Sequence, residues 1–257
     1  PRPSSIRATR SIRNVTHSRW VSCDFMIIAQ SGVRGMRAYS SLRAFSWLHS
    51  IIVGTRNDHE GIPAMSAQPD HIHAIDLRIP DAEELDEDLR KYFAVCQDKL
   101  GMVPNVLQSY AVVPERLRAF VAMYNELMLS EMGLSRLERE MIATVVSSEN
   151  KCFYCVVAHG AGVRELSGDP MLGELMAINY RAAEISARQR AMLDFAVRMT
   201  RAPAEVEETD RQALRDAGFA ERDIMDIASV AAFFNMTNRA STALDRMPNP
   251  EYHAKAR

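Results

Sequence analysis

Cysteine is scarce in this sequence, and long apolar runs are missing. Only four cysteines occur among 257 residues, too few for the disulfide-dense scaffold of a small secreted domain. No stretch reaches the roughly 18 to 20 consecutive apolar residues that a membrane-spanning helix needs. Hydrophobic residues make up 47% and charged residues 25%, close to the average for globular chains, which excludes an intrinsically disordered protein. We therefore expect a globular, cytoplasmic protein with a sizeable core and no membrane partner.

Charge is distributed unevenly along the chain. Residues 1–64 contain nine arginines, no lysine and three acidic residues, a net charge of +6, whereas the remainder holds 22 basic and 30 acidic residues. Neither part interleaves basic and aromatic residues as nucleic-acid-binding proteins do, so no nucleic-acid partner is predicted. An Arg-rich, Ser-rich and acid-poor start is typical of a targeting segment or of a disordered or non-native extension. We predict such an extension over residues 1–64 and one folded domain over residues 65–257.

The folded part has no convincing period-two pattern, and its apolar residues recur at three- and four-residue spacing, which predicts an all-α fold. Pro104, Pro114 and Ser135 are residues that open helices, and Gly101 and Gly133 are residues that end them. The expected helices include residues 81–100, 186–200, 205–217 and 221–244. Two stretches, 134–146 and 185–197, share four identities in thirteen positions, which indicates a weak internal duplication of a helical hairpin.

The side chains that most strongly indicate catalytic chemistry lie between residues 140 and 159. At about 100° per residue, Cys152, Cys155 and His159 share one face of a helix. Asn150 is a poor residue for a helix interior, so we expect a break there and a new helix beginning near Cys152. The thiols then lie in a first helical turn, where free N–H groups and the helix dipole favour a thiolate. An imidazole one turn further on can carry the proton that the thiol loses.

Other interpretations of the cluster remain open. A structural zinc site needs four ligands, but the segment offers one Cys-x-x-Cys pair and one histidine, with Cys96 far away in the sequence. Two buried, inert cysteines are a further alternative, and a structural disulfide is disfavoured in a reducing cytosol. His71 and His73 lie in a polar lead-in and are expected to be solvated rather than to bind metal. A redox-active dithiol is the favoured interpretation, and we expect neither a metal nor a cofactor.

The motif Cys152-x-Tyr-Cys155-x-x-x-His159, preceded by Glu140, resembles the alkylhydroperoxidase AhpD-like branch of the carboxymuconolactone decarboxylase superfamily. Within that branch it looks closest to the bacterial "peroxidase-related enzyme" proteins. The segments 100–105, 134–140 and 234–239 agree, and the resemblance covers about residues 75–252. It implies an all-α fold that assembles into homo-oligomers, with the dithiol beside a helical interface.

The resemblance also implies roles for four residues. Cys155 matches the thiolate that attacks the peroxide, and Cys152 matches the resolving thiol that closes a disulfide. His159 and Glu140 match a relay that removes the proton from the attacking cysteine. The implied activity is a thiol-dependent peroxidase that reduces a hydroperoxide and is regenerated by an external dithiol reductant. An acid–base lactone decarboxylase and a non-catalytic, redox-sensing helical oligomer are the alternatives.

Three further polar positions have alternative interpretations. Tyr154 stands where the best-characterised relatives carry a second histidine, and a phenol with a pKa near ~10 cannot act as a base at neutral pH, although it can donate a hydrogen bond. Glu149 completes a Glu-x-x-Cys-x-x-Cys pattern, but a solvated carboxylate at a helix end is the simpler expectation. Asn238, like Asn235 and Arg239 near it, is polar within an apolar helix, where such residues could line a pocket or form hydrogen bonds between helices.

Overall fold

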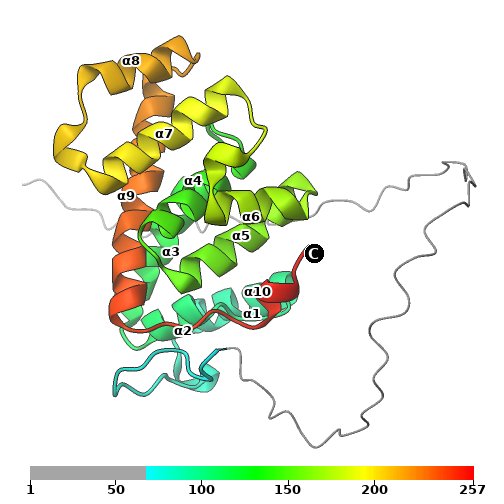
Figure 1. Ribbon diagram of the computed structural model, residues 1–257. Helices are drawn as coiled ribbons and strands as arrows, with labels where there is room; N and C mark the ends of the chain where they lie inside the picture. The colour runs from blue at the N-terminus through cyan, green and yellow to red at the C-terminus, as the bar shows by residue number, and fades with distance from the viewer. Residues whose placement is uncertain (1–67) are drawn as a thin grey trace, which may run out of the picture. The chain divides into compact units, whose positions relative to one another are not determined.

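The computed structural model describes residues 68–257, and every regular element in this part of the chain is a helix (Figure 1). The all-α prediction is confirmed, whereas the extension predicted over residues 1–64 lies outside the described residues. None of the described helices is long and apolar enough to cross a membrane. The α-helices are α1 (Glu87–Leu100), α2 (Asn105–Ala111), α3 (Pro114–Leu129), α4 (Arg136–Glu149), α5 (Phe153–Ser167), α6 (Pro170–Ile178), α7 (Ala187–Arg201), α8 (Glu208–Asp216), α9 (Glu221–Ala243) and α10 (Glu251–Ala254).

Several helix ends lie where local sequence signals predict them. The Ser135 hydroxyl accepts the backbone N–H of Glu138 at 3.2 Å, and the Glu138 carboxylate accepts the N–H of Ser135 at 2.8 Å, so the two residues form a reciprocal cap at the start of α4. Pro114 is the first residue of α3. Gly101 closes α1 at a φ of 74°, a left-handed conformation that glycine adopts without steric cost. These ends are set by short-range geometry.

Other boundaries differ from the sequence-based expectation. The helix predicted from Asp81 begins only at Glu87, because Asp81 caps a short 3-10 turn and Leu85 is extended at ψ 148°. The third α-helix ends at Leu129, before Gly133. Helices α6 and α10 were not predicted, since so few turns give little periodic signal. The internal duplication stays a prediction, although α4 and α7 both begin with a serine cap.

Helix α4 lies at the centre of the packing and contacts α5, α6, α7 and α9 (Figure 1). The largest apolar cluster includes Ile142 on α4, Leu193 on α7 and Phe234 on α9, each at most 1% exposed. A second cluster joins the helices α1, α2 and α3. Cys152, Tyr154 and Cys155 form a third, smaller cluster. The third cluster, at the start of α5, packs against Val106 of α2, and α5 as a whole contacts α4 and α9.

Candidate active site

The turn between α4 and α5 positions the two thiols. Asn150 ends α4, and Lys151 takes a left-handed conformation at a φ of 57°. The N–H of Cys152 donates to the carbonyl of Ser147 at 3.0 Å, and the N–H of Lys151 donates to the carbonyl of Ser148 at 3.1 Å. This is the Schellman pattern of helix termination. The predicted break at Asn150 is confirmed, and α5 begins directly after Cys152.

Both sulfurs are buried and in the thiol form, with Cys152 1% and Cys155 3% exposed. Hydrogen bonds from the side chain and the backbone N–H of Cys155 lower the pKa of Cys152 to about 7, although burial acts in the opposite direction. The same contact between the sulfurs, together with burial, raises the pKa of Cys155 well above its ordinary value. The dithiol can therefore hold one negative charge near neutral pH, and the thiol of Cys155 donates to that charge on Cys152.

His159 and Glu140 form a pair next to the dithiol. The Nδ1 atom of His159 lies 2.7 Å from Oε2 of Glu140, and the two side chains are 13% and 14% exposed. Because a carboxylate only accepts, Nδ1 carries the proton and Nε2 remains for other partners. Gly162 makes room for this pair, since a Cβ atom there would lie 2.8 Å from the same carboxylate oxygen. The charge of His159 also lowers the pKa of Cys152, so the imidazole lies within electrostatic reach of the dithiol.

Tyr154 is directed away from this pair. Its hydroxyl accepts the backbone N–H of Val106 at 3.1 Å, in the first turn of α2. The side chain is 4% exposed, and burial raises its pKa well above the ordinary value. Tyr154 thus anchors α2 to α5.

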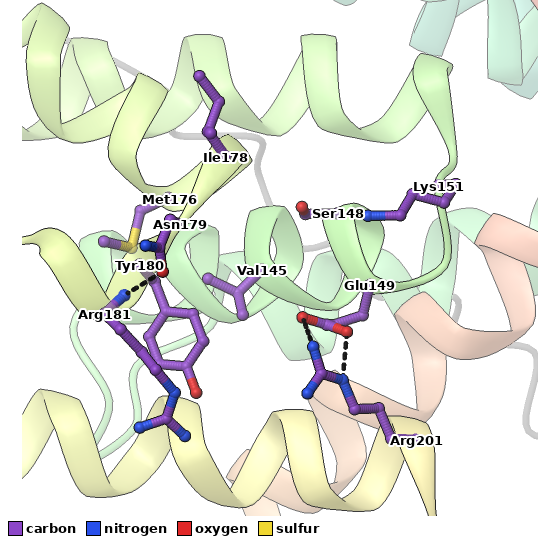
Figure 2. Close-up of a pocket in the computed structure, with 10 residues that line it drawn as sticks. All are labelled: Val145, Ser148, Glu149, Lys151, Met176, Ile178, Asn179, Tyr180, Arg181 and Arg201. Atoms are coloured by element: carbon purple, nitrogen blue, oxygen red, sulfur yellow. Dashed lines mark hydrogen bonds and ion pairs between the residues drawn. The ribbon is translucent and has the colours of Figure 1, made fainter.

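Glu149 is held by an ion pair. Its carboxylate accepts two hydrogen bonds from Arg201 at the end of α7, at 2.5 and 2.9 Å (Figure 2). The expectation of a freely solvated carboxylate is wrong, since the side chain is 17% exposed. Glu149 and Arg201 line a polar pocket of about 170 Å³ between α4, α6 and α7, to which Lys151 and Tyr180 also contribute. None of the residues that line this pocket is a cysteine or His159.

Helix α9 supplies polar side chains to the dithiol that sequence reasoning missed. Contact with Cys152 and burial raise the pKa of Cys155, and the side chains of Asn238 and Ser241, each at most 1% exposed, act in the opposite direction. Thr242 likewise contributes to lowering the pKa of Cys152. The signal that could have found them is their spacing, because residues three and four apart lie on one face of a helix. Of the three residues Asn238, Ser241 and Thr242, the sequence pattern singles out only Asn238, as a polar residue within an apolar stretch.

The two early histidines have different surroundings. The Nε2 atom of His71 lies 3.1 Å from the carboxylate of Asp245. Both ring nitrogens of His73 are buried without a hydrogen-bond partner, so the expectation that His73 is solvated is wrong. Within residues 68–257, no three His, Cys, Asp or Glu side chains come together as a possible metal site.

Comparisons with known proteins bear on the family and the fold of the chain. The model of the carboxymuconolactone decarboxylase family matches residues 114–170, which include the Cys-x-x-Cys motif. No curated protein has a similar sequence. Among solved structures, an uncharacterized peroxidase-related protein from Silicibacter sp. TM1040 is 61% identical with a TM-score of 0.72, over 75% of this chain and 100% of that chain.

Two further structures extend the comparison. An alkylhydroperoxidase AhpD core protein from Ralstonia eutropha JMP134, also an uncharacterized peroxidase-related protein, is 42% identical with a TM-score of 0.71, over 74% of this chain and 98% of that one. The debrominase Bmp8 is 19% identical with a TM-score of 0.57, over 66% of this chain and 90% of that chain. At that identity the likeness concerns the fold alone.

Proposed function

Because the chain belongs to the AhpD-like branch of the carboxymuconolactone decarboxylase superfamily, we propose that it is a thiol-dependent peroxidase. The observation that carries the proposal is a buried pair of cysteines, Cys152 and Cys155, at the start of the helix that also bears the His159–Glu140 pair. Such a site has the three parts that thiol chemistry needs: a nucleophilic sulfur, a second sulfur to resolve the product, and a group that moves protons. The proposed cycle uses no haem, flavin or metal.

The cycle begins with the thiolate of Cys155, which attacks one oxygen of the hydroperoxide. The O–O bond breaks, Cys155 becomes a sulfenic acid, and the leaving alkoxide takes a proton through His159. The sulfur of Cys152 then attacks the sulfenic sulfur, so that an S–S bond forms and water leaves. An external dithiol reduces this disulfide by supplying two electrons and two protons. Glu140 orients the imidazole and stabilises its protonated form.

The proposed substrate is a hydroperoxide, and the proposed partner is an external dithiol donor. The setting is the cytoplasm, because regeneration depends on a reducing environment. The working form is a homo-oligomer, with neither nucleic acid nor a membrane as a partner.

The test is a comparison of single cysteine variants. Reduced protein mixed with hydrogen peroxide or cumene hydroperoxide should lose two free thiols for each peroxide consumed. Cys152→Ser should be oxidised once without turning over, and Cys155→Ser should lose the activity. Cys96→Ser is the matched control, because that buried thiol lies on α1 in a different apolar cluster, and it should retain the parent rate. Peroxide consumption at the parent rate by both active-site variants would refute the proposal.

A lactone decarboxylase is the second candidate, favoured by the description of the matching family and by the His159–Glu140 pair. That pair can move a proton without help from a thiol. A decarboxylase activity would survive complete alkylation of the cysteines, whereas the peroxidase activity would not.

A non-catalytic redox sensor is the third candidate, favoured by the burial of both sulfurs. A sensor would combine very slow peroxide turnover with a change of assembly on oxidation. Light scattering of the reduced and oxidised protein, combined with the peroxidase assay, distinguishes a sensor from a peroxidase.

A further inference from the structure

The imidazole of His159 contacts an aromatic ring that the proposed cycle does not use. The ring of Phe234, on α9, has its centroid 4.5 Å from that of the imidazole, and the two rings are nearly perpendicular, at 77°. Edge-to-face packing of this kind is one of the arrangements that aromatic rings prefer. His159 is thus held by two contacts, a hydrogen bond to Glu140 at 2.7 Å and the packing against Phe234.

These two contacts restrict different motions of the imidazole. The torsion about the Cβ–Cγ bond of a histidine is broad, so the rotamer alone does not set the plane of the ring. The hydrogen bond to Glu140 holds one ring atom, Nδ1, but a bond to a single atom still allows the ring to tilt. A ring packed against Phe234 cannot tilt freely, because it would collide with the neighbouring ring. Together the contacts set the direction of Nε2, the nitrogen that remains for proton exchange.

Phe234 is itself firmly held. Its side chain is 1% exposed and belongs to the largest apolar cluster. Its ring packs at 88° against the ring of Phe233, with the centroids 5.5 Å apart. The ring of Phe233 in turn lies 5.4 Å from that of Phe120 on α3. Because such interiors are close-packed, this row of rings from α3 to α9 prevents Phe234 from moving away from the imidazole.

We infer that Phe234 is a positioning residue, which fixes the plane of the His159 imidazole so that Nε2 keeps one direction while it exchanges a proton. The effect of Phe234 on the rate of peroxide reduction rests on the proposed function. The orientation of the imidazole, by contrast, is a property of the reduced protein and can be measured without peroxide. A phenylalanine that only filled the core could be replaced by another apolar residue without any change at His159.

Phe234→Leu is the variant that tests this, because it removes the ring and keeps an apolar side chain. Phe195→Leu is the matched control, since it makes the same change in the same apolar cluster but on α7. The ¹⁵N–¹H spectrum of the imidazole is recorded on the reduced full chain at pH 8.0, and the signals of His159 are assigned by their loss in His159→Gln. The parent and Phe195→Leu should show one sharp set of signals, with the proton on Nδ1. Phe234→Leu should show broadened or multiple signals, because the ring samples several orientations.

The same two variants separate positioning from general loss of stability in the peroxidase assay. Misplacement of a reacting group by about 1 Å can lower a rate by about 100-fold. We therefore expect kcat for cumene hydroperoxide to fall by about 10- to 100-fold in Phe234→Leu, with little change in KM. Phe195→Leu should retain the parent kcat.

A measurement on the parent protein tests the contact even if Phe234→Leu does not fold. Nuclear Overhauser effects should connect the ring protons of His159 with those of Phe234, and their absence would overturn the inference. An unchanged imidazole spectrum in folded Phe234→Leu, or the same change in Phe195→Leu, would also overturn it. If the parent consumes no peroxide and Phe234→Leu still alters the imidazole spectrum, the positioning is supported and the proposed function is refuted.

Discussion

At the scale of single residues, the pKa of Cys152 sets the pH dependence of the site. Hydrogen bonds from Cys155 lower that pKa to about 7 from an ordinary value of 9.0, and a thiolate reacts where a thiol does not. The rate at which iodoacetamide alkylates Cys152 should therefore rise as the pH increases through about 7 and level off above it. Alkylation between pH 5.5 and 9.5, read by peptide mass spectrometry, measures this.

The control for that pH profile is the alkylation of Cys152 in Cys155→Ala, which lacks the main donor. Its midpoint should move upward, because the causes that lower the pKa of Cys152 would be weakened. A parent profile with its midpoint at 8.5 or above, unchanged in the variant, would contradict the expected hydrogen bond.

The residue scale also shows what could be predicted from the sequence. Cys152, Cys155 and His159 lie on one helix, so their spacing alone fixes a common face. The contacts of Asn238, Ser241 and Thr242 depend on how α9 packs against α5, and no local pattern encodes that packing. The same limit explains Tyr154 and Glu149, whose partners come from α2 and α7.

At the scale of elements, the starts of α4 and α7 are joined through one carboxylate. Glu138 caps α4 and also pairs with Arg188 on α7, and it is only 6% exposed. Arg188 in turn lies over the ring of Phe219, with its guanidinium carbon 3.8 Å from the ring centroid. The cap was predictable from Ser135 and Glu138 alone, whereas the pairing with α7 depends on tertiary packing.

Removal of this carboxylate should destabilise the protein. Glu138→Ala loses the cap and leaves Arg188 without its partner, so we expect the free energy of unfolding to fall by about 2 to 4 kcal/mol. Ser135→Ala, which affects the cap alone, should cost about 1 kcal/mol. Urea unfolding under reducing conditions measures both, and equal losses in the two variants would contradict a role for the pairing with Arg188.

At the scale of the whole molecule, α9 presents an exposed apolar side opposite its buried one. Met225 and Met236 are each 53% exposed, and Ala232 between them is also exposed. The opposite face of α9 is directed towards the dithiol. We expect the exposed apolar side to be the surface that contacts a second copy of this chain. The assembly predicted from the sequence would place the dithiol near that contact.

The oligomer is testable by mass. We expect multi-angle light scattering to give a multiple of the 28.9 kDa chain mass, and Met236→Lys to lower it, because a charge buried at an interface without a partner is costly. Met171→Lys on α6, where the side chain is 60% exposed, is the matched control and should leave the mass unchanged. A parent mass of one chain would refute the assembly.

The burial of both sulfurs affects the two halves of the proposed cycle, oxidation by a hydroperoxide and reduction by a dithiol, in opposite ways. A hydroperoxide is small and needs little room to reach a sulfur that is only 1% or 3% exposed, whereas a bulky cellular thiol needs much more. Regeneration needs that room, because a dithiol donor must bring its own sulfur into line with the S–S bond. Under the proposed cycle, a chain that encloses its dithiol so completely would have to loosen the packing around α5 before a reductant could reach the disulfide.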